Sequence, residues 1–181
     1  MLAIFSVIVG IALAVICVRR GFFPTWAIVF NVMVAVYAAV MLAPYWVGLI
    51  SDQGAVSDFR YHIVAAMLAT AGMIFAVLQI IATTFITGMY MVSFPKLFDY
   101  VASATIGFLG GKIVASFLIL ILCITPLAAK PSMEKYNLRS EEMPKELTAV
   151  IRTCDFMASA TLQVYTDKSA DIVKELITPT Y

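Results

Sequence analysis

Long apolar runs separated by short polar segments fill the first two thirds of the chain. The apolar runs cover residues 2–18, 21–50, 63–92 and 100–128. An α-helix rises about 1.5 Å per residue, so the shortest run is just long enough to span a hydrocarbon core of about 30 Å. The pattern therefore predicts four transmembrane helices, and the fold class is an all-α, polytopic membrane protein.

The pattern changes near Lys130, where a polar tail begins. Residues 1–129 hold five of the twelve Lys and Arg residues, and residues 130–181 hold the other seven. Ser140 is a favourable helix N-cap, and acidic residues follow it in the first turn. The expected tail helix carries one apolar face at helical spacing, made of Leu147, Ile151, Cys154, Ala158, Leu162 and Tyr165. A second short helix is predicted over residues 169–177. The chain thus divides into a transmembrane domain, 1–129, and an amphipathic helical tail, 130–181.

Composition excludes several classes of protein. Hydrophobic residues make up 62% of the chain and charged residues 13%, whereas soluble domains are about half apolar and about a quarter charged. A soluble enzyme and a disordered chain are therefore both excluded. Three distant cysteines cannot form a disulfide scaffold, and a net charge of +1 offers no basic surface for nucleic acid.

Residues that could perform chemistry are sparse. The only histidine, His62, lies at a predicted membrane boundary, and no Gly-x-Ser-x-Gly turn accompanies it. No pair of cysteines has the spacing of metal ligands, and no phosphate-binding loop is present. The sequence therefore predicts a protein that is not an enzyme and that carries no cofactor and no metal.

The last apolar run contains a ladder of small residues. Ser103, Gly107, Gly111 and Ala115 recur every four residues, and Gly10 belongs to a looser ladder in the first run. Four-residue spacing places small side chains on one helix face, where another helix can approach closely in lipid. Packing within the chain is the favoured interpretation, and a contact between subunits is the alternative.

Three polar side chains lie within the apolar runs. Lys112 is costly, because a lysine at the centre of a membrane helix costs about 2.5–3.5 kcal/mol on insertion scales. It either lines a polar pathway or lies near the interface, if residues 100–111 form a shallow or re-entrant entry segment. Asn31 and Gln79 are expected to hydrogen-bond between helices rather than to bind a ligand.

Two short stretches carry a family resemblance. Arg20-Gly21-Phe22-Phe23 separates the first two runs, and Asp99 precedes small residues at Ser103 and Gly107 and the pair Gly110-Gly111. Together they resemble the colicin V production protein family, the CvpA-like membrane proteins, over roughly residues 4–128. The family usually has arginine where this chain has Gly110, and a cation reappears two positions later as Lys112.

The resemblance implies a bacterial cytoplasmic (inner) membrane protein linked to toxin production or export and to envelope homeostasis. The expected function is non-enzymatic and works through helix–helix assembly. The expected partners are the lipid bilayer and either further copies of the chain or other membrane subunits. Two alternatives stay open: an accessory structural subunit of a larger membrane complex, and an oligomeric channel or transporter component lined by Lys112, Asn31 and Gln79.

Topology is the first testable prediction. Arg19-Arg20 lies in a very short loop, where the excess of positive charge on cytoplasmic loops is most informative. This loop and Lys96 should face the cytoplasm, which places the tail on the non-cytoplasmic side. A cysteine introduced into the tail should react with a membrane-impermeant reagent added to intact cells. Complete protection of that cysteine would reverse the assignment.

Overall fold

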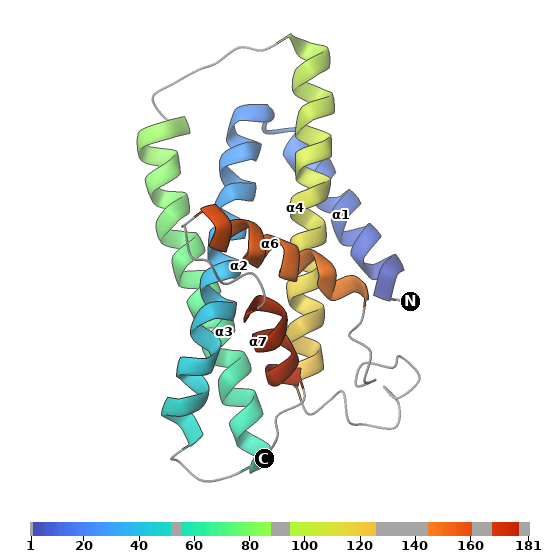
Figure 1. Cartoon of the computed structure of the whole chain (residues 1–181). Helices are drawn as coiled ribbons and strands as arrows, with labels where there is room; N and C mark the ends of the chain where they lie inside the picture. Colours follow the sequence, from blue (N-terminus) through green and yellow to red (C-terminus); the bar gives the residue numbers. More distant parts are fainter. Residues whose placement is uncertain (1, 52–55, 88–94, 126–144, 161–167, 178–181) are drawn as a thin grey trace.

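A computed structural model describes residues 2–51, 56–87, 95–125, 145–160 and 168–177. Helices make up almost all of these ranges, and they contain no strand (Figure 1). The long helices are α1 (Leu2–Val18), α2 (Phe22–Ser51), α3 (Val56–Ile81) and α4 (Lys96–Ile124). A π-helical segment, η1 (Ala82–Thr87), continues α3. The tail contributes a 3-10 turn, η3 (Lys145–Leu147), and the helices α6 (Thr148–Ala160) and α7 (Lys168–Ile177).

Three helices in the described part of the chain are long and apolar enough to cross a membrane. These spans are Phe22–Leu49, Phe59–Phe85 and Lys96–Ile124, and α1 is a shorter apolar helix of 17 residues. The all-α membrane class predicted from the sequence is therefore confirmed. The count of four spans depends on α1, whose length is close to the thickness of a bilayer core.

Two boundaries differ from the sequence predictions. The polar segment between the second and third apolar runs, residues 51–62, is partly helical, because α3 already begins at Val56. An apolar run marks only the lipid-embedded part of a helix, and a helix can continue into the polar region where water satisfies its first N–H groups. The fourth run begins earlier than expected too, since α4 starts at Lys96 directly after Pro95.

Helix α4 is unbroken from Lys96 to Ile124. Residues 100–111 are therefore the first half of one long helix, although the sequence left a separate re-entrant segment open. Gly107, Gly110 and Gly111 are all buried in this helix. Glycine in a helix interior costs about 1 kcal/mol relative to alanine, so these positions serve packing rather than helix propensity.

The glycines of α4 place its backbone directly against α1. A Cβ atom added to Gly111 would lie 2.7 Å from the Cα atom of Gly10, and one added to Gly107 would lie 2.7 Å from the Cβ of Cys17. The two helices run in opposite directions, because residues late in α1 meet residues early in α4. Ser103 and Ala115, the other members of the ladder, are fully buried. The small-residue face of α4 is thus occupied by a helix of the same chain.

Helix α2 lies at the centre of the fold and contacts α3, α4, α6 and α7. Its buried face consists largely of small residues, including Ala35, Ala39 and Ala43. Helix α3 packs mainly on α2, and in its most apolar 18-residue stretch only 11% is buried, against 44% in that of α2 and 61% in that of α4. Most of the α3 surface therefore faces away from the protein.

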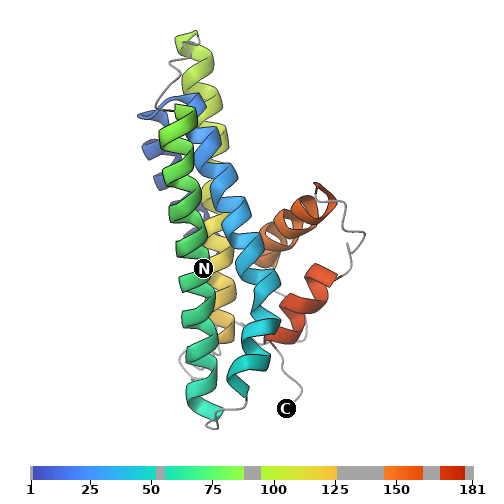
Figure 2. The same cartoon turned by 90° about the vertical axis from the view of Figure 1, so that its left-hand side faces the viewer.

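The tail helices α6 and α7 project from one side of the long helices but are anchored to α2 and α4 (Figure 2). One apolar cluster joins buried residues of α2, α3 and α4 to Leu147, Val150, Cys154, Val173 and Ile177. The Ser116 hydroxyl of α4 donates to the Glu146 carbonyl and accepts from the Val150 N–H, which secures the start of α6. The apolar face of the tail is therefore covered by protein.

The expected tail face compares closely with the observed one. Leu147, Cys154 and Ala158 are buried, whereas Ile151 is only partly buried. The sequence prediction missed Val150 and Met157, which are buried as well. Its remaining members, Leu162 and Tyr165, and the expected N-cap Ser140 lie outside the described residues.

Replacement of Gly107 by leucine tests the contact between α1 and α4. The added side chain would collide with Cys17 and with the backbone at Ala14, so we expect a loss of about 1–3 kcal/mol or more in the free energy of unfolding. Thermal unfolding in detergent micelles measures this loss. Gly48→Leu is the matched control, because a Cβ at Gly48 meets no atom within 4 Å. Equal effects of the two substitutions would contradict a special role for the contact.

Candidate functional site

The turn between α1 and α2 has a backbone that only glycine adopts easily. Gly21 has φ = +85°, in the left-handed region that other residues enter at a cost of about 1–2 kcal/mol. The Arg20 N–H bonds the Cys17 carbonyl, and the Thr25 N–H bonds the Gly21 carbonyl. The chain thereby reverses direction between two membrane helices with only three residues outside helical structure.

Asp99, in the first turn of α4, contacts the turn between α1 and α2. Its Oδ1 atom accepts a hydrogen bond of 2.7 Å from the Phe22 N–H, which is one of the free donors at the start of α2. A Cβ added to Gly21 would lie 3.3 Å from the Oδ2 atom. The carboxylate therefore lies at the positive ends of two helix dipoles, those of α2 and α4. Among the amino acids, only aspartate combines a negative charge with a side chain of this length.

Two hydroxyl groups complete the junction. The buried Thr25 hydroxyl lies 3.1 Å from the Cys17 carbonyl and 2.7 Å from the Gly21 carbonyl, so it ties the end of α1 to the start of α2. The Ser103 hydroxyl bonds the carbonyl of Asp99 one turn earlier in α4. Sequence reasoning missed Thr25, although its position four residues after a turn glycine is a usable signal.

The family-like residues therefore meet in space, although 78 positions separate Gly21 from Asp99 along the chain. We call Gly21, Phe22, Thr25 and Asp99 the turn junction. Arg20 is exposed beside it. The groups of the turn junction are hydrogen-bonded to one another, an arrangement that holds helices together rather than one that presents a reactive atom.

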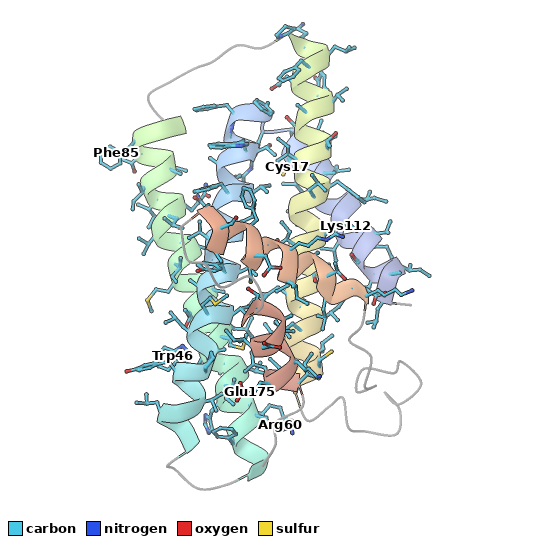
Figure 3. The ribbon with its side chains drawn as sticks, in the orientation of Figure 1. Cys17, Trp46, Arg60, Phe85, Lys112 and Glu175 are labelled. Atoms are coloured by element: carbon cyan, nitrogen blue, oxygen red, sulfur yellow. The ribbon has the colours of Figure 1, made fainter. Side chains whose placement is uncertain are left out.

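Lys112 lies near the middle of α4 (Figure 3). It is sixteen residues after Lys96, or about 24 Å along the helix, and is half-buried. Its Nζ atom lies 5.8 Å from the centroid of the Phe108 ring, and such a cation–π contact offsets part of the cost of the charge. The Phe108 ring in turn covers Gly10. Asp99 is about 20 Å away along the same straight helix, so the two charges do not pair.

The polar residues of the middle runs form a link between helices. The Asn31 Nδ2 atom donates to the Gln79 Oε1 atom at 3.2 Å, which joins α2 to α3. Asn31 is 5% exposed, and Gln79 is half-buried. Lys112 instead contacts the Phe108 ring of its own helix. The three polar residues therefore make two separate contacts.

The nucleophilic side chains are in poor positions for chemistry. His62 is exposed near the start of α3, and the three cysteines are buried singly in α1, α4 and α6. Burial, with a smaller contribution from the Asp155 charge, raises the pKa of Cys154 to about 12. A thiol with this pKa stays protonated at neutral pH and is a weak nucleophile. Among the described residues, no three His, Cys, Asp or Glu side chains gather into a metal site.

Comparison with known families gives one result. The family model described as colicin V production protein matches residues 2–144. This range includes all four long helices and the turn junction, and it stops just before η3 and α6. No curated protein and no solved structure shows a significant match to the chain.

Loss of the Asp99 carboxylate should weaken the turn junction. Asp99→Ala leaves the Phe22 N–H without its acceptor, and we expect a loss of about 1–3 kcal/mol in the free energy of unfolding. Asp99→Asn keeps an oxygen acceptor and loses the charge, so its effect should be smaller. Thermal unfolding in detergent micelles measures both. An alanine variant as stable as the unmodified chain would contradict a holding role for Asp99.

Proposed function

The chain belongs to the colicin V production protein family, and from this premise we propose that it acts in export or envelope homeostasis without being an enzyme. Its task is to organise membrane helices, its own and those of partners. The turn junction is the observation that carries this proposal. Its chemistry is hydrogen bonding between helix ends, in which the Asp99 carboxylate and the Thr25 hydroxyl are both engaged with backbone groups.

The bacterial cytoplasmic (inner) membrane is the proposed location. Arg19, Arg20 and Lys96 are exposed at the same end of the long helices, which supports a cytoplasmic position for this end (Figure 1). The tail then belongs on the non-cytoplasmic side. The bilayer itself is a partner, because α1 and α3 expose many large apolar side chains, such as Ile8 and Met73.

Lys112 favours a second candidate function, an oligomeric channel or transporter component. A half-buried ammonium group midway along a membrane helix is the usual mark of a polar pathway. Several copies would be needed to enclose such a path. Lys112→Met, which removes the charge and keeps an unbranched side chain, should preserve function if the organising role is right and abolish it if the lysine lines the path.

Complementation of a strain that lacks the protein tests the main proposal. The readouts are toxin export and growth under agents that stress the envelope, with protein levels measured in parallel. We expect Asp99→Ala and Gly107→Leu to fail at matched levels, because both disturb helix packing. His62→Ala and Cys154→Ser should complement fully. Loss of function in either of these two would indicate chemistry and overturn the proposal.

A further inference from the structure

The tail meets α4 at a defined distance from the cationic end of the long helices. The Ser116 hydroxyl bonds Glu146 and Val150 where α6 begins. Ser116 lies seventeen residues after Asp99 and twenty after Lys96. At 1.5 Å per residue these separations are about 26 and 30 Å, and the hydrocarbon core of a bilayer is about 30 Å thick. The start of α6 therefore lies where the hydrocarbon core ends on the tail side, which is the side opposite Lys96.

Helix α1 gives a second measure of the same level. Its 17 residues are about 26 Å long, so nearly the whole helix is needed to cross the hydrocarbon core. Its first residue, Leu2, packs against the apolar cluster that includes Leu147, and α1 contacts η3. The beginning of α1 thus lies beside the beginning of the tail helices, at the tail-side surface of the hydrocarbon core.

The apolar residues of α4 beyond Ser116 have protein, rather than lipid, as their main cover. Phe117, Leu120 and Ile124 are buried, and they belong to the apolar cluster that the long helices share with the tail. Contacts with the tail therefore account for the hydropathy of this part of α4. The hydrocarbon core does not have to extend to Ile124 to explain it.

Helix α6 runs across α2 and α4 rather than along them (Figure 1). Figure 2 shows that α6 and α7 project together to one side of the long helices. Lipid surrounds membrane helices on this side, so an element that projects sideways at the level of the bilayer surface lies on lipid. Amphipathic helices that bind membrane surfaces lie in the same plane.

The exposed side of α6 has a composition that suits this position. It consists of four residues at spacings of four, four and three: Thr148, Arg152, Phe156 and Ser159. These spacings place the four side chains on one face of the helix, which we call the α6 outer face. Phe156 is 58% exposed although it is large and apolar. An exposed aromatic ring one turn from an arginine is typical of a helix at a membrane interface.

The exposed charges of this part of the tail have one sign. Among residues 145–160, the charged side chains that are exposed are Lys145 and Arg152, and both are cations. The two acidic residues of the same stretch, Glu146 and Asp155, are half-buried. The outward charge is therefore complementary to the phosphates of lipid headgroups and favours anionic lipids.

We propose that the α6 outer face binds the surface of the bilayer on the tail side. Arg152 contacts lipid phosphates, and the Phe156 ring lies among the upper parts of the acyl chains. Arginine suits the first task because its planar group presents several N–H donors to a phosphate. The preferred lipid is an anionic phospholipid. The apolar face of α6 remains on α2 and α4, so the lipid contact adds to the protein contact.

This lipid contact goes beyond the proposed function. It depends on the level at which α6 is attached, and it holds for either orientation of the chain in the membrane. It involves no residue of the turn junction, so the two can fail separately.

Fluorescence quenching in lipid nanodiscs that hold one full-length chain tests the level of α6. Ser159→Cys carries the dye, because this position lies on the α6 outer face and leaves Arg152 and Phe156 in place. The unmodified chain, whose three cysteines are buried, sets the labelling background. We expect lipids with a nitroxide at the top of the acyl chain to quench this dye strongly, and iodide in the water to quench it weakly.

Two reference positions calibrate the measurement. Glu175→Cys lies on α7, farther from the cationic end than α6 (Figure 3), and iodide should quench a dye there strongly. Met73→Cys lies within the α3 span, where the native side chain is 68% exposed. A dye at this position should be quenched by a nitroxide deep in the acyl chain and hardly at all by iodide.

Substitutions on the α6 outer face test the two contacts one at a time. Phe156→Ser should move the dye at position 159 toward water, with a loss of lipid quenching and a gain of iodide quenching. Arg152→Gln should lower the ratio of quenching by anionic to quenching by zwitterionic nitroxide lipids about two- to fivefold. Arg19→Gln is the matched control, because it removes the same charge from an exposed position at the other end of the long helices.

Three results would overturn the lipid contact or its selectivity. Iodide quenching at position 159 that equals the quenching at Glu175→Cys places α6 in water and overturns the contact. Protection from both kinds of quencher assigns the α6 outer face to protein and overturns it too. Equal quenching by anionic and zwitterionic lipids overturns the preference for anionic lipid. The proposed function survives all three results, because complementation by the Asp99 and Gly107 variants tests it independently.

Discussion

The backbone contact between α1 and α4 is the interaction on which the rest of the structure depends. In lipid, apolar side chains gain little by leaving the solvent, so helices associate through close fit and hydrogen bonds. Gly10 and Gly111 meet without side chains between them, and this approach fixes how α1 lies against α4. The end of α1 then places Gly21 beside the first turn of α4. Only there can Asp99 reach the Phe22 N–H and set the direction of α2.

Helix α2 transmits this arrangement to the other elements. One of its faces carries α3, with the Asn31–Gln79 bond as the polar part of that contact, and another carries α6 and α7. The tail depends on α4 as well, through the Ser116 hydroxyl at the start of α6. The amphipathic tail thus has a protein surface for its apolar face.

Sequence patterns predicted the elements better than their contacts. Apolar runs locate helices because the bilayer requires them, yet they placed the start of α3 seven residues late, since polar first turns leave no apolar signal. The ladder at Gly107 was visible because four-residue spacing repeats, but its partner helix was not. The contact of Asp99 with Phe22 depends on the path of the whole chain and cannot be read from either stretch.

Burial divides the small residues of this protein by role. Gly10 on α1 and the ladder on α4 are buried and hold the chain to itself, so a larger side chain there acts on folding. Gly72 on α3 is exposed and a Cβ there meets no atom within 4 Å, so a larger side chain has room in the chain. Helix α3 is held on one side alone, through α2. The Asn31–Gln79 bond is the polar part of this one-sided attachment, so loss of either amide weakens the contact that holds α3 to the rest of the chain.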